Sequence, residues 1–265
     1  MSDHKTALIT GASFGIGLEL ARIFAREGHN LVLVARSADR LRQLASELEK
    51  AHGTRSLILA ADLTDPGAPA YILDQTVRAG INVDILVNNA GFGQYGLFVE
   101  NDLEECLRQI QLNVTALTHL TRLFLPEMVE RQSGRILNVA STAAFQPGPL
   151  MAVYFATKAY VLLFSEAIAN ELAGTGVTVT CLCPGATATE FHKRANATEM
   201  RLLGFGTMDA RTVAEDGYRA LMSGKPVIIS GFKNWLLAQS VRFSPRRLVT
   251  AIARMSQERK GQGQT

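Results

Sequence analysis

The chain has 265 residues, a net charge of +3, 47% hydrophobic side chains and 19% charged side chains. A chain of this length and composition buries one full-sized core, which predicts a globular protein of one domain, or two at most. Its scattered glycines and prolines exclude collagen-like and low-complexity proteins. The charge is uneven, because residues 231–265 hold seven Lys and Arg side chains against Glu258 alone. Residues 1–230 are therefore slightly acidic and are not a nucleic-acid surface.

The cysteines and the N-terminal residues bear on the cellular compartment. Cys106, Cys181 and Cys183 are odd in number and have no neighbouring histidines at zinc spacing, so we expect free thiols and no metal site. No apolar run approaches the roughly 18 residues that span a bilayer, and residues 1–5 lead into an apolar strand without a signal-peptide core. These features predict a cytoplasmic protein.

Short apolar and β-branched runs alternate with longer amphipathic stretches along the chain. The expected strands cover residues 6–10, 31–35, 56–60, 83–88, 135–141, 177–183 and 227–230. The expected helices cover residues 15–28, 38–50, 68–79, 102–130, 150–173 and 210–223. Continuously apolar strands such as 31–34 are buried on both faces, which predicts an α/β fold with a doubly wound parallel sheet. Residues 186–208 interrupt the alternation and are a candidate substrate lid.

A glycine-rich turn joins the first strand to the next helix, with the sequence Thr10-Gly11-Ala12-Ser13-Phe14-Gly15-Ile16-Gly17. Gly11 permits a tight turn, Gly15 allows the backbone to approach a pyrophosphate, and Gly17 allows close packing of helix and strand. The glycine spacing is G-x-x-x-G-x-G instead of G-x-G-x-x-G, and a turn without a ligand is the alternative. The strand before the turn and the helix after it favour a dinucleotide site.

The end of the second strand discriminates between the two nicotinamide dinucleotides in folds of this kind. An acidic side chain there would bind the ribose 2′-hydroxyl of NAD(H), whereas an arginine would bind the 2′-phosphate of NADP(H). The strand ends in Ala35-Arg36-Ser37, and Arg36 offers a planar guanidinium to a phosphate. Asp39 is interpreted as first-turn helix charge. The sequence therefore favours NADP(H), with a solvated Arg36 beside a capping Ser37 as the alternative.

Two further strand exits suit the same ligand. Asp62-Leu63 follows the third strand, where the carboxylate would accept a hydrogen bond from an adenine amino group or play a purely structural role in a turn. Asn88-Asn89-Ala90-Gly91 follows the fourth strand, and its small residues admit a flat ligand against the backbone. An ordinary Asn/Gly turn is the alternative there.

A hydroxyl, a phenol and an ammonium group follow the fifth strand. Ser141 ends this strand, and Tyr154 and Lys158 lie four residues apart in a helical stretch, which places them on one helix face. A close ammonium lowers the pKa of a tyrosine from about 10, which makes proton exchange with an alcohol or carbonyl oxygen feasible. Ser141 would hold the same oxygen. A Tyr and a Lys on an ordinary helix surface are the alternative.

Together these motifs resemble those of the classical short-chain dehydrogenase/reductase family over about residues 5–190. The matching positions are Thr10–Gly17, Asn88–Gly91, Asn113, Ser141, Tyr154, Lys158 and Pro184-Gly185. The resemblance implies a Rossmann-type sheet of seven strands in the order 3-2-1-4-5-6-7. It also implies hydride transfer between a nicotinamide and a carbonyl or secondary alcohol.

The resemblance further implies roles for individual residues. Tyr154 would be the acid/base, and Lys158 would bind the nicotinamide ribose and tune Tyr154. Ser141 would orient the substrate oxygen, and Asn113 would hold a water in a proton relay. Thr187 stands where the family usually has an aliphatic residue. The implied cofactor contacts are Gly11, Ser13, Phe14, Gly15, Ile16, Gly17, Arg36, Asp62, Leu63, Asn89, Ala90, Gly91, Tyr154, Lys158, Pro184, Gly185, Thr187 and Thr189.

Segments outside the motifs bear on the substrate. They carry the large apolar residues Phe92, Tyr95, Phe145, Phe191, Leu202, Leu203 and Phe205. With few charges beside them, these side chains predict a lipophilic carbonyl substrate, and a 3-oxoacyl thioester is the alternative. They would otherwise cover the core or a subunit interface. A nucleotide-binding regulatory protein without turnover is the alternative of another class, and the intact Ser141, Tyr154 and Lys158 favour the enzyme.

Residues 231–265 lie outside the family pattern. Their apolar side chains are interleaved with basic ones, and Ser244-Pro245 predicts a helix start. We expect this basic amphipathic extension to pack on the same domain as residues 1–230, with an anionic membrane surface or a neighbouring subunit as the alternative contact. We further expect a homodimer or homotetramer with a small-molecule substrate and no nucleic-acid partner.

Overall fold

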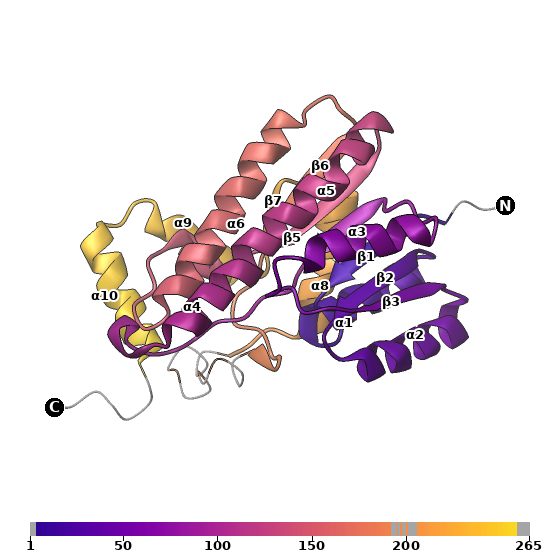
Figure 1. Cartoon of the computed structure of the whole chain (residues 1–265). Helices are drawn as coiled ribbons and strands as arrows, with labels where there is room; N and C mark the ends of the chain where they lie inside the picture. The colour runs from indigo at the N-terminus through magenta and orange to yellow at the C-terminus, as the bar shows by residue number, and fades with distance from the viewer. Residues whose placement is uncertain (1–3, 192–194, 196, 198–199, 201–205, 259–265) are drawn as a thin grey trace.

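The computed structural model describes residues 4–258 apart from 192–194, 196, 198–199 and 201–205. The described residues form a sheet of seven parallel strands in the order β3-β2-β1-β4-β5-β6-β7, which confirms the expected Rossmann-type topology (Figure 1). The strands are β1 (Thr6–Thr10), β2 (Asn30–Ala35), β3 (Ser56–Ala60), β4 (Ile85–Asn88), β5 (Gly134–Val139), β6 (Val177–Cys183) and β7 (Val227–Ile229).

Helices cover both faces of the sheet. One face packs against α1 (Gly15–Arg26), α2 (Ala38–His52) and α8 (Ala210–Met222). The other packs against α3 (Ala68–Arg78), α5 (Leu117–Glu130) and α6 (Ala152–Glu171). This sandwich explains the continuously apolar strands, because in β2 Leu31 and Leu33 face the first helical layer while Val32 and Val34 face the second. Each such buried side chain stabilises the fold by about 1.5–3 kcal/mol relative to an exposed one.

The helix expected over residues 102–130 is interrupted in its middle. Asp102 caps α4 (Leu103–Ile110) by accepting a hydrogen bond from the backbone of Glu104. A π-helical turn, η2 (Gln111–Ala116), then joins α4 to α5. A π turn inserts extra backbone into a helix without changing its apolar character, so the sequence pattern does not register it. The turn directs Asn113 into the protein interior, where it is buried.

The long apolar helix α6 corrects one expectation. The helix has 20 residues, and an 18-residue window of it has a mean hydropathy of 1.3, so by length and composition it could cross a membrane. The prediction that no apolar stretch approaches that length was therefore wrong. Val161 and Leu162 are nevertheless buried against the sheet, and Phe155 is buried in a cluster with Ala143 and Met151. The same helix carries the buried Lys158. The apolar composition of α6 is therefore that of a core helix.

The C-terminal extension folds into two helices. After β7, α9 (Phe232–Val241) and α10 (Arg246–Gln257) follow one another at one end of the molecule (Figure 1). The helix start expected at Ser244-Pro245 is confirmed, because α10 begins directly after Pro245. Buried Ala238 of α9 and buried Val249 and Ala253 of α10 face the protein.

Candidate active site

The exits of the first and fourth strands are held together by Thr10. Its Oγ1 accepts hydrogen bonds from the backbone N–H groups of Asn89 and Ala90, at 3.0 Å each, and donates to the carbonyl of Val87 at 3.2 Å. The Asn89 side chain donates in turn to the carbonyl of Thr10 at 2.9 Å. These bonds fix the backbone of the glycine-rich turn against the small residues that follow β4.

Two glycines of the turn have conformations that other residues rarely adopt. Gly11 has φ +67°, and a Cβ there would lie 3.0 Å from Ala90 Cα. Gly15 has φ +53°, and a Cβ there would lie 2.8 Å from Thr189 Cγ2. Gly15 therefore also makes room for the segment that follows β6, which the sequence did not indicate. The two glycines form a cradle between β1, β4 and β6.

The start of α1 offers hydrogen-bond donors to an anion. The helix begins after Phe14, whose side chain cannot cap it, and the first turn, Gly15–Leu18, carries no acidic residue. The N-terminal N–H groups and the positive end of the helix dipole therefore favour a phosphate group. With the glycine cradle beside it, this helix start fits the pyrophosphate of a dinucleotide.

Two arginines stand at the exit of β2. Arg36 is largely exposed and lies 3.9 Å from Asp62 at the exit of β3. The guanidinium of Arg40, in the first turn of α2, lies 3.9 Å from the centroid of the Phe14 ring. Burial opposes ionisation of Asp62, but hydrogen bonds from Thr64 and the charge of Arg36 outweigh it and lower the pKa of the carboxyl. The side of the cradle away from β4 is thus cationic apart from one carboxylate.

The structure brings Ser141, Tyr154 and Lys158 to one place. Ser141 precedes the short helix η3 (Thr142–Phe145), and its Oγ lies 3.4 Å from the carbonyl of Pro184. Lys158 is buried, donates from Nζ to the carbonyl of Val139 at 2.7 Å, and lies 5.9 Å from the centroid of the Tyr154 ring. Tyr154 and Lys158 therefore share the face of α6 that points at the end of β5.

The pKa values of this group differ from the sequence expectation. Burial raises the pKa of Tyr154 to about 12, although a hydrogen bond with Ser141 opposes the shift. Burial also lowers the pKa of Lys158 from 10.5 to about 8. The expectation that the Lys158 ammonium lowers the pKa of Tyr154 was thus wrong for the protein alone, because desolvation acts on both groups and Lys158 is bound to the Val139 carbonyl. Near neutrality Tyr154 carries its proton and suits a proton donor.

Asn113 holds the segment after β4 in place. Its Oδ1 accepts from the N–H of Phe92 at 3.1 Å, and its Nδ2 donates to the carbonyl of Phe92 at 2.9 Å and to Thr157 Oγ1 at 3.0 Å. A Cβ on Gly91 would lie 3.1 Å from Asn113 Oδ1 and 3.5 Å from Lys158 Nζ. The Asn113 side chain is therefore occupied by protein partners, and Gly91 lies close to both this side chain and the amine of Lys158.

The segment after β6 closes the side of the site opposite the segment after β4. Thr187 Oγ1 donates to the carbonyl of Gly185 at 2.9 Å, and Thr187 forms a parallel bridge with Met208. A Cβ on Gly185 would lie 2.8 Å from Cγ of Asn234 in α9. The C-terminal extension therefore packs directly against the Pro184-Gly185 segment.

The remaining predicted cofactor contacts differ in how deeply their side chains are buried. Ser13 lies partly buried in the glycine-rich turn. The side chain of Leu63 is buried in the core, so this residue presents only backbone to a ligand, whereas Ile16 packs on the core but is partly exposed.

An apolar cluster surrounds the Tyr154 ring. Phe191 lies 5.1 Å from it between ring centroids, and Tyr95 packs in the same cluster with Met151. Phe145 packs on the core around Val161 and the cysteines, which is the alternative that the sequence left open for these apolar residues. Leu202, Leu203 and Phe205, expected near the substrate as well, lie outside the described residues.

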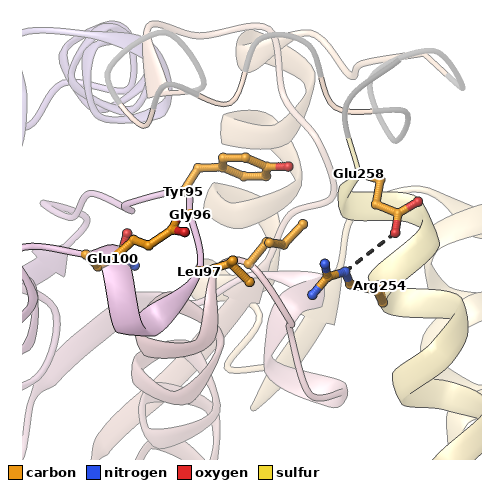
Figure 2. Close-up of a pocket in the computed structure, with 8 residues that line it drawn as sticks. Tyr95, Gly96, Leu97, Glu100, Arg254 and Glu258 are labelled. Carbon is orange, nitrogen blue, oxygen red and sulfur yellow. Dashed lines mark ion pairs between the residues drawn. The ribbon is translucent and has the colours of Figure 1, made fainter. Parts of the chain in front are cut away.

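A cavity of about 510 Å³ opens beyond Tyr95. It lies between the segment after β4 and the C-terminal helix α10, and its lining includes Tyr95, Gly96, Leu97, Glu100, Leu150, Arg254 and Glu258 (Figure 2). Arg254 and Glu258 form an ion pair at 3.5 Å across its α10 side (Figure 2). Leu150 has φ +68°, a strained conformation of the kind that concentrates at binding sites. Because Tyr95 borders both this cavity and the Tyr154 cluster, the two adjoin.

Sequence reasoning missed three contributors to this region. Arg40 follows Arg36 by one helical turn, a spacing that places both near the exit of β2. Asn234 and Arg254 reach the site only through the packing of α9 and α10, and no local pattern marks such long-range contacts.

Cys181 and Cys183 lie behind the site, in the core. Their sulfur atoms are 3.8 Å apart on one face of β6, and Cys106 is likewise a free thiol. The expectation of small buried thiols agrees with this arrangement.

The fold and the strand-exit residues define a nucleotide-binding α/β protein with a buried Ser–Tyr–Lys group. The sequence matches the family model described as short chain dehydrogenase over residues 5–200. The chain belongs to the short-chain dehydrogenase/reductase family, as the sequence motifs indicated.

Individual relatives differ in what their names describe. A very-long-chain 3-oxoacyl-CoA reductase of Bos taurus is 36% identical over 192 residues, which are 71% of this chain and 61% of that protein. A short-chain dehydrogenase of Sphingobium yanoikuyae, solved in complex with NADPH, is 34% identical with a TM-score of 0.78 and 98% coverage of both chains. A bulky-bulky ketone specific alcohol dehydrogenase of Comamonas testosteroni is 33% identical with a TM-score of 0.77, covering 91% of this chain and 93% of that one. The chain spans about three fifths of the length of several curated relatives that it matches, at 60 to 63%.

Proposed function

We propose that the protein is an NADP-dependent oxidoreductase that transfers a hydride between nicotinamide and the carbonyl or secondary alcohol of a lipophilic substrate. The observation that carries this proposal is the meeting of Ser141, Tyr154 and Lys158 beside a glycine cradle at the carboxyl edge of the sheet. A merely structural Tyr and Lys would not need to be buried together next to a dinucleotide-shaped cradle. Loss of activity in Tyr154→Phe with retained cofactor binding, argued in the Discussion, tests it.

The chain's own residues would perform the proton part of the reaction. When bound, the nicotinamide supplies or accepts the hydride. Tyr154 would donate its hydroxyl proton to the carbonyl oxygen as that oxygen gains negative charge, and Ser141 would hold the same oxygen by a hydrogen bond. Lys158 would stabilise the resulting phenolate while its amine holds the ribose. Asn113 would position the segment after β4 through its hydrogen bonds with Phe92 and Thr157, and would hold a water in the proton relay.

The preference for NADP(H) is proposed from the two arginines at the exit of β2. Arg36 is exposed, and its ion pair with Asp62 is long, so its guanidinium can turn to a 2′-phosphate. Arg40 is one helical turn further on and already lies over the edge of the cradle, on Phe14. The NADPH complex of the Sphingobium relative supports the same choice.

The Arg36→Ala variant is expected to raise the dissociation constant for NADPH by about tenfold and to leave that for NADH unchanged, because one charge-assisted contact with the 2′-phosphate is lost. Titration of cofactor fluorescence measures both constants. Arg42→Ala is the matched control, since Arg42 lies nearby in α2 and pairs with Asp39. A preference of the intact protein for NADH, or an equal loss for both cofactors in Arg36→Ala, would contradict the assignment.

The lipophilic substrate is proposed from the apolar cluster around Tyr154 and the cavity beyond Tyr95. The ketone-specific relative of Comamonas supports a bulky ketone, whereas the bovine relative supports the alternative, a 3-oxoacyl thioester. Arg254 is the cavity residue that separates these two substrates, because the carrier of a natural acyl thioester bears phosphate groups and a simple ketone does not.

We expect NADPH-dependent reduction of bulky apolar ketones, with kcat/KM unchanged in Arg254→Met. The alternative predicts a fall of about tenfold in kcat/KM confined to 3-oxoacyl thioesters, as expected for loss of one charge-assisted contact. Steady-state NADPH oxidation over a matched series of ketones, thioesters and sugars decides between them. A sugar reduced faster than any apolar ketone would overturn the lipophilic assignment.

Three further properties belong to this proposal. The apolar side chains exposed on α4 and α6, such as Leu103, Leu107 and Leu163, suit a homodimer or homotetramer interface. The three free thiols suit a cytoplasmic location. A non-catalytic NADP-binding protein remains the alternative class, and it predicts cofactor binding without turnover on any of the substrates above.

A further inference from the structure

The two C-terminal helices are basic throughout. Residues 231–257 contain five Lys and Arg residues and no Asp or Glu. Within the described part of the chain, Lys233, Arg242, Arg246 and Arg247 are exposed and form no ion pair with a carboxylate. Their charge is therefore available to an anionic surface.

The first turn of α10 is basic, although the start of a helix intrinsically favours acidic residues. Its first two residues are Arg246 and Arg247, at the positive end of the helix dipole, where acidic residues stabilise and cations destabilise. A helix selected for stability alone would carry Asp or Glu there. The arginines at this position therefore point to a function outside the fold.

The same segment exposes large apolar side chains. Helix α10 turns one apolar stripe inward, through Val249 and Ala253, and a second one outward, through Leu248, Ile252 and Met255. The spacing of four and three residues in the outward set places these side chains on one side of the helix.

Aromatic side chains extend this exposed apolar set into α9 and the turn. Trp235 is 45% exposed and stacks on Phe232 at 5.9 Å between ring centroids. Phe243, in the turn between the helices, is 89% exposed and follows Arg242. Exposed Trp and Phe beside Arg and Lys are typical of elements that lie in a membrane interface.

We propose that the exposed side chains of residues 232–257, here called the C-terminal surface, dock onto an anionic lipid bilayer. Charge complementarity decides for this occupant. Another exposed apolar face, over residues 97–110, is interleaved with Glu100, Glu104 and Glu105, which an anionic bilayer would repel. The C-terminal surface has the opposite charge and the aromatic side chains that such a bilayer accommodates.

Docking would also orient the cavity described above. Arg254 lies in α10, so the helix that presents the C-terminal surface also forms one wall of the cavity. A lipophilic substrate dissolved in the bilayer would then reach the cavity from the surface on which the protein rests. This second step rests on the proposed function, whereas docking itself does not.

The full-length protein tests docking directly, because Trp235 is the only tryptophan in the chain and lies in the surface. We expect its emission to shift to the blue, and the protein to co-sediment, with phosphatidylcholine vesicles containing phosphatidylglycerol but not with phosphatidylcholine alone. Added salt should weaken the binding. No shift and no co-sedimentation with the anionic vesicles would overturn the proposal, whatever the enzymatic activity.

Charge reversal separates binding from folding. The Arg246→Glu/Arg247→Glu variant should weaken vesicle binding by at least about tenfold, while the acidic residues favour the helix start and keep the fold intact. Lys50→Glu/Arg55→Glu, with the same charge change at the exposed end of α2 and in the loop after it, should bind as the intact protein does. An equal loss in both variants would overturn the proposal. So would a Leu248→Ser/Ile252→Ser variant that lowers the oligomeric mass without weakening vesicle binding, since a second copy would then cover the surface.

Discussion

The Tyr154→Phe variant is expected to lose about 10²- to 10⁴-fold in kcat for carbonyl reduction, the usual contribution of a positioned general acid. Burial holds the pKa of Tyr154 at about 12, so near neutrality the hydroxyl is protonated and ready to donate. Phenylalanine keeps the ring that packs on Phe191 and removes only that proton. NADPH binding should stay within about twofold of the intact protein, because the change is confined to the transition state.

NADPH oxidation with saturating ketone and a separate cofactor titration measure the two quantities. Tyr160→Phe is the matched control, since Tyr160 lies on the same helix, is partly exposed, and has its hydroxyl 3.0 Å from Thr118 Oγ1. Turnover that survives in Tyr154→Phe, or that falls equally in Tyr154→Phe and Tyr160→Phe, would remove Tyr154 from the mechanism. Turnover absent from the intact protein, with NADPH still bound, would favour the non-catalytic alternative.

Features encoded within a few neighbouring residues were predictable from the sequence. The apolar run Leu31–Val34 indicated a strand covered on both faces, and it is β2 at the middle of one half of the sheet. Gly11 and Gly15 indicated a glycine-rich turn after the first strand, and both adopt positive φ angles there. The spacing of Tyr154 and Lys158 placed them on one helix face, because four residues make about one turn.

Features that depend on distant residues were not predictable in this way. The π-helical turn at Gln111–Ala116 leaves the apolar pattern almost unchanged, so a continuous helix was expected. The place of Asn234 against Gly185 depends on how α9 folds back over the sheet.

The direction of the Tyr154 pKa shift likewise depends on residues outside the local sequence pattern, so it was not predictable. Charge proximity within α6 suggested a lowered pKa, but burial depends on Phe191, Met151 and the segments after β4 and β6, which pack around the ring. Desolvation by these distant residues outweighs the effect of the nearby amine.

The Lys158→Met variant is expected to separate activity from stability. Burial lowers the pKa of Lys158 from 10.5 to about 8, so at pH 7 the folded protein must keep a buried ammonium, which costs about 3 kcal/mol. Methionine removes this cost but leaves the Val139 carbonyl without its partner, which costs about 1–3 kcal/mol. The free energy of unfolding at pH 7 should therefore stay level or rise, while kcat should fall by about 10²-fold or more.

The pH dependence of both quantities follows from the same shift. Between pH 8 and 10.5 the unfolded chain keeps a proton on Lys158 that the folded protein has released, so stability should rise with pH across this window. Tyr154 should make stability fall as the pH rises above 10, because its pKa of about 12 in the folded protein exceeds its value in the unfolded chain. Carbonyl reduction should decline as pH rises through 8, because the ammonium that stabilises the phenolate is lost.

Urea unfolding at several pH values and kcat profiles measure these changes, with the exposed Lys50→Met as the matched control. In Lys158→Met the rise in stability between pH 8 and 10.5 should disappear, whereas Lys50→Met should retain it. If Lys158→Met unfolds more easily than the intact protein by about 2 kcal/mol or more at pH 7, the ammonium stabilises the fold. The cost of keeping it charged would then not be the reason for its shifted pKa.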